Sequence, residues 1–502
     1  MSLTRNVIAN YAGQIYVALI GIALVPLYVK YMGIEAFGLV GFFAMLQAWF
    51  MLLDMGLTPT MSRETARFGG GSTDALTLRR LLRALEGVFV AVAAIGMVAL
   101  VVGSDRIAAD WLKVQDLPLA EVQRAVILMA IIVGLRWICG LYRGAIIGFE
   151  RLVWLNVFNA GIATVRFGLV VPFLMFVGST PTHYFGFQLV VAVFELGMLV
   201  HMAYRLMPAV DGTARLPWDW RPLRGILKFS LTIAFTSAVW VLVTQTDKLL
   251  LSGIVALEEY AHFTLAVLVA SGIMMISSPI SGALLPRMTR LNAQGDEPAL
   301  IGLYRRATQL VAVVAIPAAV TLALFAEPVL WAWTGDRELA RIAAPVLALY
   351  ALGNGFLALA AFPYYLQFAK GDLRLHLIGN FFFLLLFIPL LLWMTRTHGM
   401  LGAGYAWIIA NATPFVLWLP VVHRRFSRGL HSLWLWRDIG PIAFASAVAA
   451  ACASSLIQWP TGRLAVVASL AGVGACVLLS AMAGSSWLRG LLVARWHARV
   501  SQ

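Results

Sequence analysis

Apolar runs long enough to cross a bilayer recur along the whole chain, and they limit its possible folds more than any other feature. An α-helix of about 18 or more apolar residues spans the hydrocarbon core. Of the 502 residues, 61% are hydrophobic and only 12% are charged, whereas a soluble domain has about 25% charged residues. The sequence therefore predicts an all-α polytopic membrane protein with about 14 transmembrane helices. The predicted spans are 7–29, 37–58, 84–103, 123–147, 152–177, 183–205, 228–251, 260–284, 304–326, 342–368, 375–395, 400–422, 438–458 and 463–484.

Positive charge is concentrated in alternate loops. If the N-terminus lies in the cytoplasm, the cytoplasmic segments hold 26 of the 37 lysines and arginines, and the outer segments hold eight. By the positive-inside rule, this asymmetry indicates that both termini are cytoplasmic. The net charge of +14 then reflects membrane topology, so it does not indicate a nucleic-acid partner.

The loops and the rare residue types exclude several classes of protein. No connecting loop is long enough for a catalytic domain outside the membrane, and the three cysteines all fall in apolar runs. No lysine follows a glycine, as the phosphate-binding loop of an ATPase requires. We therefore expect a protein that is not an enzyme and that has no metal site and no cofactor. Its energy would come from a gradient of H⁺ or Na⁺, from the substrate or from a separate subunit.

A weak internal similarity divides the chain into two repeats. Residues 31–42 align with 254–265, and residues 60–65 align with 284–289. Both copies fall at the first outer loop and the first cytoplasmic exit of a six-helix unit. Because six helices return the chain to the same side, the units are parallel repeats, and we expect two lobes that form a V-shaped central cavity. The predicted parts are an N-terminal six-helix lobe (1–206), a cytoplasmic linker (207–227), a C-terminal six-helix lobe (228–425), two additional transmembrane helices (426–485) and an amphipathic cytoplasmic tail (486–502).

Three ionisable residues lie near the middle of predicted spans in the first lobe, namely Arg136, Arg166 and Glu195. Such residues are costly in lipid and usually face the interior of a helix bundle. Arg143 is seven residues after Arg136 and Asn159 is seven residues before Arg166, so each pair shares a helical face. These faces predict one hydrated, cationic cavity. Alternatively, the arginines bond to backbone carbonyls or to Glu195, and Arg143 snorkels to the inner interface.

Five further polar residues are candidates for the same function. Asn10 and Gln14 are one turn apart in the first span, and they either line the cavity or pack between helices. Asp54 lies in the cytoplasmic third of the second span, within LLDMGLTPTMSRETAR. It either pairs with a nearby arginine or takes part in gating or ion coupling. Asp247 and Lys248 lie near the outer end of the seventh span, where they form either an interfacial pair or a gate.

Several loose motifs follow one another in an order that is typical of one family. They are ANYAGQ (9–14), VPLYVKYMGIEAFGLVGFF (25–43), LLDMGLTPTMSRETAR (52–67), LYRGAIIGFERLVWLN (141–156), DKLLLSGIVALEEYAHFTLA (247–266) and LLPRMTRL (284–291). In this order they resemble the polysaccharide transporter family, the O-antigen and exopolysaccharide flippases of the multidrug/oligosaccharidyl-lipid/polysaccharide exporter (MOP) superfamily. The resemblance covers residues 5–425.

The resemblance implies a flippase that works by alternating access. It would move undecaprenyl-diphosphate-linked oligosaccharide from the inner to the outer leaflet of the bacterial inner membrane, while the polyprenyl chain stays in lipid. Glu195 and Asp54 are the candidates for binding a coupling ion, and the sequence leaves coupling to H⁺, coupling to Na⁺ and uncoupled exchange open. Glu195 is either displaced from an arginine when the diphosphate arrives, or it is a permanent packing partner. The expected substrate-binding residues are Arg136, Arg143, Arg166, Asn159, Asn10 and Gln14.

Two other functions remain open at this point. A multidrug exporter of the same superfamily would share the two lobes, but it would need an acidic or apolar cavity for cationic drugs. An oligosaccharide polymerase or ligase would normally need a large outer loop, and the sequence has none. As partners we expect the polyprenyl-diphosphate-linked glycan and membrane lipids, with a polysaccharide polymerase and chain-length proteins as further candidates. We expect a monomer.

Overall fold

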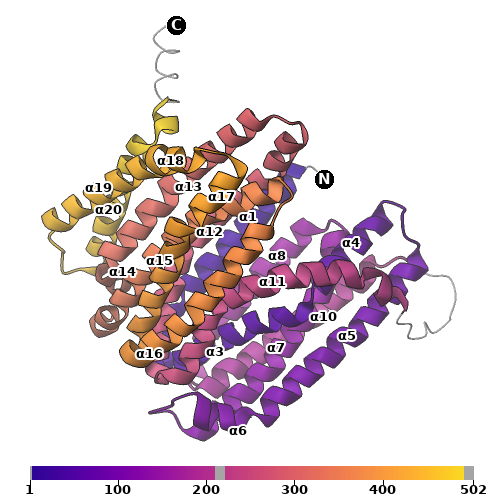
Figure 1. The fold of residues 1–502 in the computed structure, drawn as a ribbon. Coiled ribbons are helices and arrows are strands. Elements are labelled where there is room, and N and C mark those ends of the chain that lie inside the picture. Colours follow the sequence, from indigo (N-terminus) through magenta and orange to yellow (C-terminus); the bar gives the residue numbers. More distant parts are fainter. Residues whose placement is uncertain (1–2, 210–220, 491–502) are drawn as a thin grey trace. The chain divides into compact units, whose positions relative to one another are not determined.

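The computed structural model describes residues 3–209 and 221–490. Its described part is almost wholly helical and contains no β-strand (Figure 1), which confirms the predicted all-α fold. Residues 210–220 of the predicted linker and 491–502 of the predicted tail lie outside the described residues. Within the described ranges, side chains are described everywhere except at 3–12, 221–234, 236, 237, 276 and 278–283.

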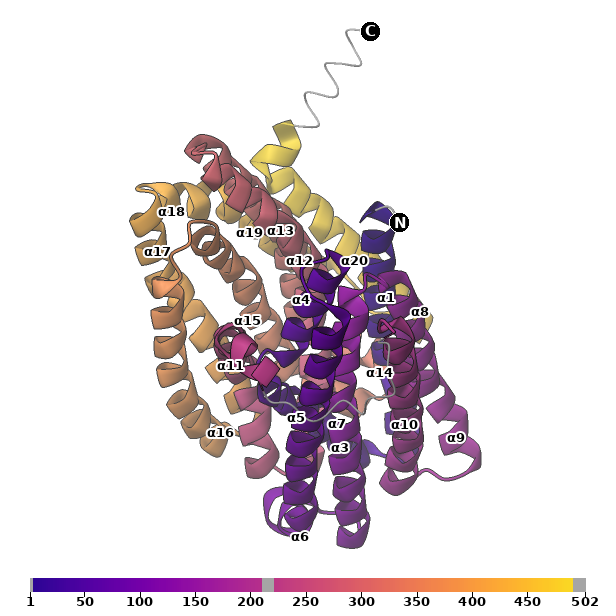
Figure 2. The same ribbon diagram turned by 90° about the vertical axis from the view of Figure 1, so that its right-hand side faces the viewer.

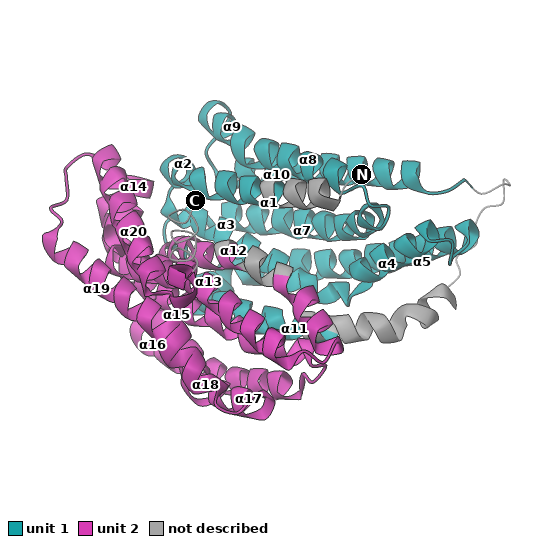
Figure 3. Cartoon of the chain, turned by 90° about the horizontal axis from the view of Figure 1, so that it is seen from above, with its two compact units in different colours: residues 1–261 teal, residues 262–502 magenta. Residues whose placement is uncertain are grey.

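The chain forms two compact units, residues 1–261 and 262–502 (Figure 3). The helices of the first unit are α1 (Leu3–Ala23), α2 (Val25–Met32), α3 (Ile34–Phe50), the 3₁₀ helix η1 (Met51–Asp54), α4 (Leu57–Gly69), α5 (Ala75–Val102), α6 (Ser104–Arg106), the π-helix η2 (Ile107–Trp111), α7 (Leu119–Gly148), α8 (Leu152–Ala163), the π-helix η3 (Thr164–Leu169), α9 (Val170–Phe176), α10 (Pro181–Leu206) and α11 (Arg221–Ile254). Helix α12 (Leu257–Ala293) leads into the second unit. The second unit continues with α13 (Glu297–Leu324), α14 (Ala326–Thr334), α15 (Arg337–Ala369), α16 (Arg374–Leu417), α17 (Leu419–Phe426), α18 (Leu430–Leu433), the π-helix η4 (Trp434–Ile439), α19 (Gly440–Leu456) and α20 (Arg463–Gly484).

Eleven helical stretches of the described residues are long and apolar enough to cross a membrane. One of them, Arg374–Phe426, covers the two predicted spans 375–395 and 400–422. The two spans are separated by a kink inside α16 at Gly399, where φ is 56° and ψ is −139°. Helices α11 and α12 contain the predicted spans 228–251 and 260–284, respectively. The polytopic architecture agrees with the prediction, and the total number of spans stays a prediction.

The two units do not divide the chain where the sequence repeat does. Helix α11 packs against α3, α4 and α5, so its contacts assign it to the first unit. The predicted lobes instead divide at 207–227, before α11, because that division follows the order of the spans. The repeat, the lobe boundaries and the V-shaped arrangement therefore stay predictions.

Helix α7 is the central element of the first unit, where it packs against α3, α4, α5 and α10 (Figure 2). Gly140, Gly144 and Gly148 form a stripe at i, i+4 and i+8 that faces α4. A Cβ atom added at Gly144 would lie 2.5 Å from the carbonyl oxygen of Thr58, which is too close for two real atoms. Because small residues let helix backbones approach one another, the stripe fixes α4 against α7. It thereby helps to position the arginines that α7 carries.

Replacement of Gly144 by alanine is expected to lower the thermal stability of the purified protein. The added methyl group must displace the backbone of α4, and such overpacking costs about 1–3 kcal/mol. Gly161→Ala is the matched control, since an added Cβ there meets nothing within 4 Å. Differential scanning fluorimetry in detergent should show a lower unfolding midpoint for Gly144→Ala alone. Equal midpoints for the two variants would contradict the close contact between α4 and α7.

Candidate functional site

A buried carboxylate in the first unit holds two of the predicted arginines. Glu195 on α10 is 1% exposed, and its Oε1 accepts a hydrogen bond from Nη2 of Arg143 on α7. Its Oε2 accepts a second bond, of 2.5 Å, from Nη2 of Arg166 on η3. The two arginine side chains are 31% and 20% exposed. One carboxylate thus joins three elements of the first unit and is neutralised by two guanidinium groups.

The third predicted arginine is held by neutral amides. Arg136 donates from Nη1 to Gln47 Oε1 at 3.1 Å and from Nη2 to Gln188 Oε1 at 2.8 Å. Its guanidinium lies 5.3 Å from the centroid of the Phe43 ring, within the range of a cation–π contact. No ion pair involves Arg136 within the described part of the chain. We use the name Glu195 cluster for Arg136, Arg143, Arg166 and Glu195 with the two glutamines Gln47 and Gln188.

The Glu195 cluster has more positive charge and more donors than it uses internally. The cluster contains three guanidinium groups and one carboxylate, so two positive charges are in excess. The Nε atoms of Arg136 and Arg166 are buried and have no hydrogen-bond partner among the described residues. Since buried donors are almost always paired, these two unpaired donors distinguish the cluster from a purely structural network. The arrangement is therefore suited to an anion.

The π-helix η3 gives Arg166 its place in the Glu195 cluster. A π turn leaves backbone carbonyls without their usual α-helical partners, and such turns often occur at functional sites. Here the carbonyl of Arg166 accepts from Nε2 of Gln188 at 3.0 Å, and the carbonyl of Phe167 accepts from the hydroxyl of Tyr28 at 2.7 Å. Gln188 thus bonds to Arg136 and to the backbone at Arg166, so it links the two arginines.

Three other predicted binding residues are not joined to the Glu195 cluster by the described contacts. The side chain of Asn10 lies outside the described residues, although its backbone is part of α1. Gln14 is exposed on the same helix. Asn159 on α8 is partly buried, and its Oδ1 atom has no partner within the described part of the chain. A binding role for these three residues stays a prediction.

Asp54 caps a break between two helices. Met55 (φ 44°) and Gly56 (φ 70°) are both left-handed, and they separate η1 from α4. Asp54 Oδ1 accepts from the hydroxyl of Thr58 at 2.5 Å and from its backbone N–H at 3.2 Å, so it satisfies a free donor at the start of α4. Among the described residues Asp54 forms no ion pair, so the arginine partner that we considered from the sequence is replaced by Thr58.

The adjacent residues Asp247 and Lys248 form a pair on α11. Lys248 Nζ lies 3.4 Å from Asp247 Oδ1 and donates to the carbonyl of Thr244 at 2.7 Å. The Asp247 side chain is fully buried. The structure thus brings the two side chains together as a pair, while the position of the pair at the membrane interface and a gating role stay predictions.

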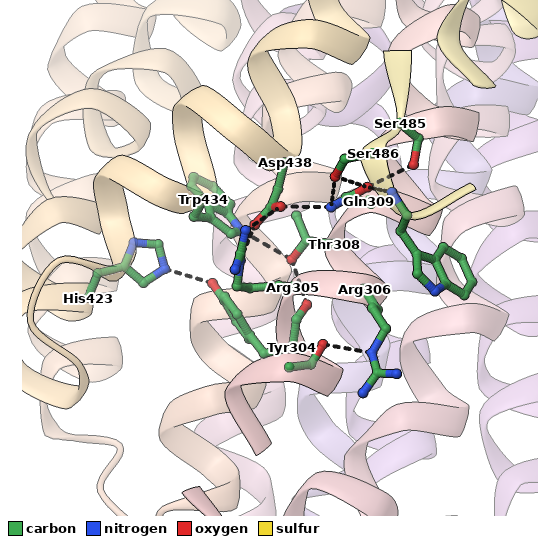
Figure 4. Close-up of polar contacts among 12 residues, drawn as sticks. Tyr304, Arg305, Arg306, Thr308, Gln309, His423, Trp434, Asp438, Ser485 and Ser486 are labelled. Atoms are coloured by element: carbon green, nitrogen blue, oxygen red, sulfur yellow. Dashed lines mark hydrogen bonds and ion pairs between the residues drawn. The ribbon is translucent and has the colours of Figure 1, made fainter. Parts of the chain in front are cut away.

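A second polar network, which the sequence did not reveal, lies in the second unit (Figure 4). Asp438 on η4 is fully buried and accepts two bonds from Arg305 on α13, from Nε at 2.7 Å and from Nη2 at 3.0 Å. Gln309 donates to Asp438 at 2.7 Å and accepts from Ser485 at 2.7 Å. Here one guanidinium faces one carboxylate in a bidentate pair. The network therefore fastens the two predicted C-terminal spans to α13 without excess charge.

Next to this network, buried Tyr304 and His423 and half-buried His431 form a chain of polar contacts. The Tyr304 hydroxyl lies 2.7 Å from Nε2 of His423, and Nδ1 of His423 lies 3.0 Å from Nδ1 of His431. Trp434 donates to Thr308 Oγ1 at 3.1 Å. Tyr304 and His423 are 119 residues apart and Thr308 and Trp434 are 126 residues apart, so the spacing of residues gave no sign of these two contacts. Like Asp438 and Arg305, these residues satisfy one another, which distinguishes them from the Glu195 cluster.

Comparison with known proteins agrees with the family resemblance of the motifs. A family model described as a polysaccharide biosynthesis protein matches residues 152–338. A protein of Shigella flexneri described as "Putative O-antigen transporter" is 20% identical over 411 residues, which are 82% of this chain and 95% of that protein.

Two solved structures show what fold the chain has. The lipid II flippase MurJ in its inward closed conformation aligns with a TM-score of 0.74 and 13% identity, over 96% of this chain and 99% of that chain. An inward-facing multidrug resistance transporter of the MATE family, in the MOP superfamily, aligns with a TM-score of 0.68 and 13% identity, over 83% and 96% of the two chains. The proteins found by these comparisons are transporters and flippases rather than catalysts.

Removing the Glu195 carboxylate and the Arg166 guanidinium, singly and together, is expected to reveal strong coupling. Glu195→Gln leaves two guanidiniums without their anion. Adding Arg166→Gln to that variant should therefore lower the free energy of unfolding less than Arg166→Gln does in the wild type. The double variant should lose about 1–3 kcal/mol less unfolding free energy than the sum of the single variants. Chemical denaturation in detergent measures these losses. Glu338 and Arg341, which are 65% and 67% exposed, form the control pair, whose coupling should be much smaller. Additive losses at Glu195 and Arg166 would contradict the buried ion pair.

Proposed function

We propose that this chain is a polysaccharide transporter of the MOP superfamily and, more specifically, a flippase for lipid-linked oligosaccharide. The family model, the Shigella flexneri relative and the shared fold support this proposal. The substrate is a glycan attached to a polyprenyl lipid through a diphosphate. The protein moves this molecule from the inner to the outer leaflet by alternating access, while the polyprenyl chain remains in the bilayer.

The charge balance of the Glu195 cluster carries this proposal. A diphosphate is a compact anion that cannot cross the hydrocarbon core unpaired, because burying an isolated charge is very unfavourable. Arginine donates bidentate hydrogen bonds to phosphate oxygens, and the Glu195 cluster holds two excess positive charges and two unpartnered Nε donors among the described residues. The arriving diphosphate takes the place of the Glu195 carboxylate on Arg143 and Arg166. Asn159, Asn10 and Gln14, predicted from the sequence, are further candidates for contact with the glycan.

Displacement of Glu195 provides a means of ion coupling. Once its two guanidiniums bind phosphate, the buried carboxylate loses its counter-charge and must take up H⁺ or Na⁺, since an unpaired charge is unfavourable there. Release of that ion accompanies return of the carboxylate to the arginines. Asp54 at the α4 break is a second candidate for ion binding, and the Asp247–Lys248 pair is a candidate gate.

The runner-up function is export of cationic drugs. It is favoured by the fold shared with MATE multidrug transporters, among them one called DinF-BH, which aligns with a TM-score of 0.59 and 15% identity. The sign of the excess charge in the Glu195 cluster distinguishes a flippase from a drug exporter, because an excess of guanidinium groups repels a cationic drug and attracts a diphosphate. The Glu195 cluster therefore favours the anionic lipid-linked glycan.

We place this multi-pass membrane protein in the bacterial inner membrane with both termini in the cytoplasm. The support for this orientation is the concentration of 26 of the 37 basic residues in the segments assigned to the cytoplasm, as the positive-inside rule requires. The glycan leaves the protein in the outer leaflet, where a polysaccharide polymerase and chain-length proteins are candidate partners. We propose that the working unit is a monomer.

Arg136→Ala and Arg166→Ala are expected to reduce glycan export at least about tenfold, since a hydrogen bond to a charged group contributes about 1.5–3 kcal/mol. The readout is the leaflet accessibility of the polyprenyl-diphosphate glycan in cells. Lysine at the same positions should restore export only in part, because it lacks the planar fork of arginine. Arg124→Ala is the control, since this α7 side chain is 60% exposed. Membrane abundance is measured in parallel.

Arg136→Ala is the more telling of the two variants, because Arg136 forms no ion pair within the described part of the chain. Its removal therefore leaves Glu195 with both of its partners. If both alanine variants export glycan as well as Arg124→Ala does, the arginines are structural and the proposed site is wrong.

A further inference from the structure

A pocket of about 650 Å³ lies in the second unit, away from the residues discussed so far. It is formed by the end of α13, by α14, by the start of α15 and by the connection between α19 and α20. Its volume is in the range of sites that bind small molecules, about 300–1,000 Å³. The residues that matter for its chemistry are Glu327, Trp331, Arg337, Ser454, Trp459 and Thr461.

Arg463 holds the two halves of this pocket together. It is the first residue of α20, and its Nη2 donates to the carbonyls of Ala332 at 3.0 Å and Trp333 at 2.9 Å in the last turn of α14. A cation is favourable at a helix C-terminus. Gly335 then turns the chain with φ 79°, and a Cβ there would meet the Arg463 guanidinium at 2.7 Å. These bonds fix the end of α14, which contributes to the pocket wall, against the start of α20.

The wall of the pocket combines aromatic rings with free polar groups. Trp459 packs edge-on against Phe325, with ring centroids 5.7 Å apart, and Arg337 lies 4.8 Å from the ring of Trp331. Glu327 is exposed and belongs to no ion pair within the described part of the chain. Indole rings offer flat apolar faces, and a free carboxylate accepts strong hydrogen bonds. A pyranose matches this set, since its ring face is apolar and its hydroxyl groups lie at the edge.

The margin of the pocket is apolar and exposed. Leu324, which lines the pocket, is 51% exposed. An exposed leucine beside tryptophans is typical of a membrane–water interface. A ligand here can therefore keep an acyl or prenyl chain in the bilayer while its polar end enters the pocket.

We propose that this pocket binds a sugar residue of a lipid-linked saccharide at the outer membrane interface. The inference rests on the proposed flippase function, which supplies such a ligand. The outer placement follows from the low basic charge of the segments that contain Arg337 and Arg463, compared with the cytoplasmic segments, by the positive-inside rule. The diphosphate is bound by the first unit, whereas the glycan is bound by the second unit when it emerges in the outer leaflet.

The test is direct binding of glycan to the purified full-length protein in detergent. The probe is the oligosaccharide released by mild acid from the polyprenyl-diphosphate pool of the native host. Saturation-transfer difference NMR, which detects weak binding, should show transfer to sugar ring protons for the wild type. Loss of an aromatic stack should weaken this binding about tenfold in Trp459→Ala. Loss of a charged acceptor should weaken it about fivefold in Glu327→Gln.

Two controls keep this test decisive. Trp436→Phe changes a tryptophan that is 72% exposed and lies outside the pocket, so it should bind like the wild type. Glu327 is exposed and glutamine is nearly isosteric with it, so Glu327→Gln still tests the sugar site if Trp459→Ala does not fold. Binding that is absent in the wild type, or equal in wild type and Glu327→Gln, overturns the proposal. Displacement of the sugar by glycerophosphoethanolamine at equal concentration also overturns it, because the pocket would then be a phospholipid headgroup site.

This binding experiment contains no transport step. If the arginine variants export normally but the released glycan binds at the pocket, the proposed translocation site fails and the sugar site stands. If the glycan does not bind but the arginine variants lose export, the flippase stands and the sugar site fails.

Discussion

The structure of the first unit depends on one buried carboxylate shared by two guanidinium groups. Glu195 brings together α7, η3 and α10 through Arg143 and Arg166. An isolated charge is very costly in such a place, and the ion pair offsets most of that cost. Because the two guanidinium groups need a counter-charge, Glu195 can leave them only when another anion takes its place. A diphosphate is such an anion, which is why one interaction can serve both the fold and the transport of substrate.

The two polar networks of the chain differ in what they leave unpaired. In the second unit, Asp438 and Arg305 form a bidentate pair, and Gln309 completes it. Both of these charges have their partner, so the network fastens helices together and needs no ligand. In the Glu195 cluster, Arg136 is held by neutral amides and two Nε donors have no partner among the described residues. Excess charge of one sign, rather than burial alone, therefore separates a binding site from a structural pair.

The sequence could predict the membrane fold and, as one of two alternatives, the contact of Arg166 with Glu195, because the cost of charge in lipid and the helical repeat leave few arrangements. It did not predict that Arg143 pairs with Glu195 instead of snorkelling to the inner interface. It could not predict the partner of Arg136, since Gln47 lies 89 residues away and only the packing of α3 on α7 brings them together. The π turn at Arg166 has no sequence signature of its own.

Asp54 bonds to Thr58 rather than to an arginine, because the left-handed Met55 and Gly56 direct it there. Asp438 and Arg305, 133 residues apart, are joined only by tertiary structure.

The central claim is that the Glu195 carboxylate exchanges places with the substrate diphosphate and takes up an ion when displaced. The most direct measurement is transport of labelled polyprenyl-diphosphate oligosaccharide in proteoliposomes, at several pH values and under imposed H⁺ and Na⁺ gradients, for the wild type and Glu195→Gln. We expect Glu195→Gln to fold and bind substrate but to lose both the acceleration by a gradient and the pH response of the wild type. Transport by Glu195→Gln at the wild-type rate, with an unchanged pH profile, would contradict the exchange.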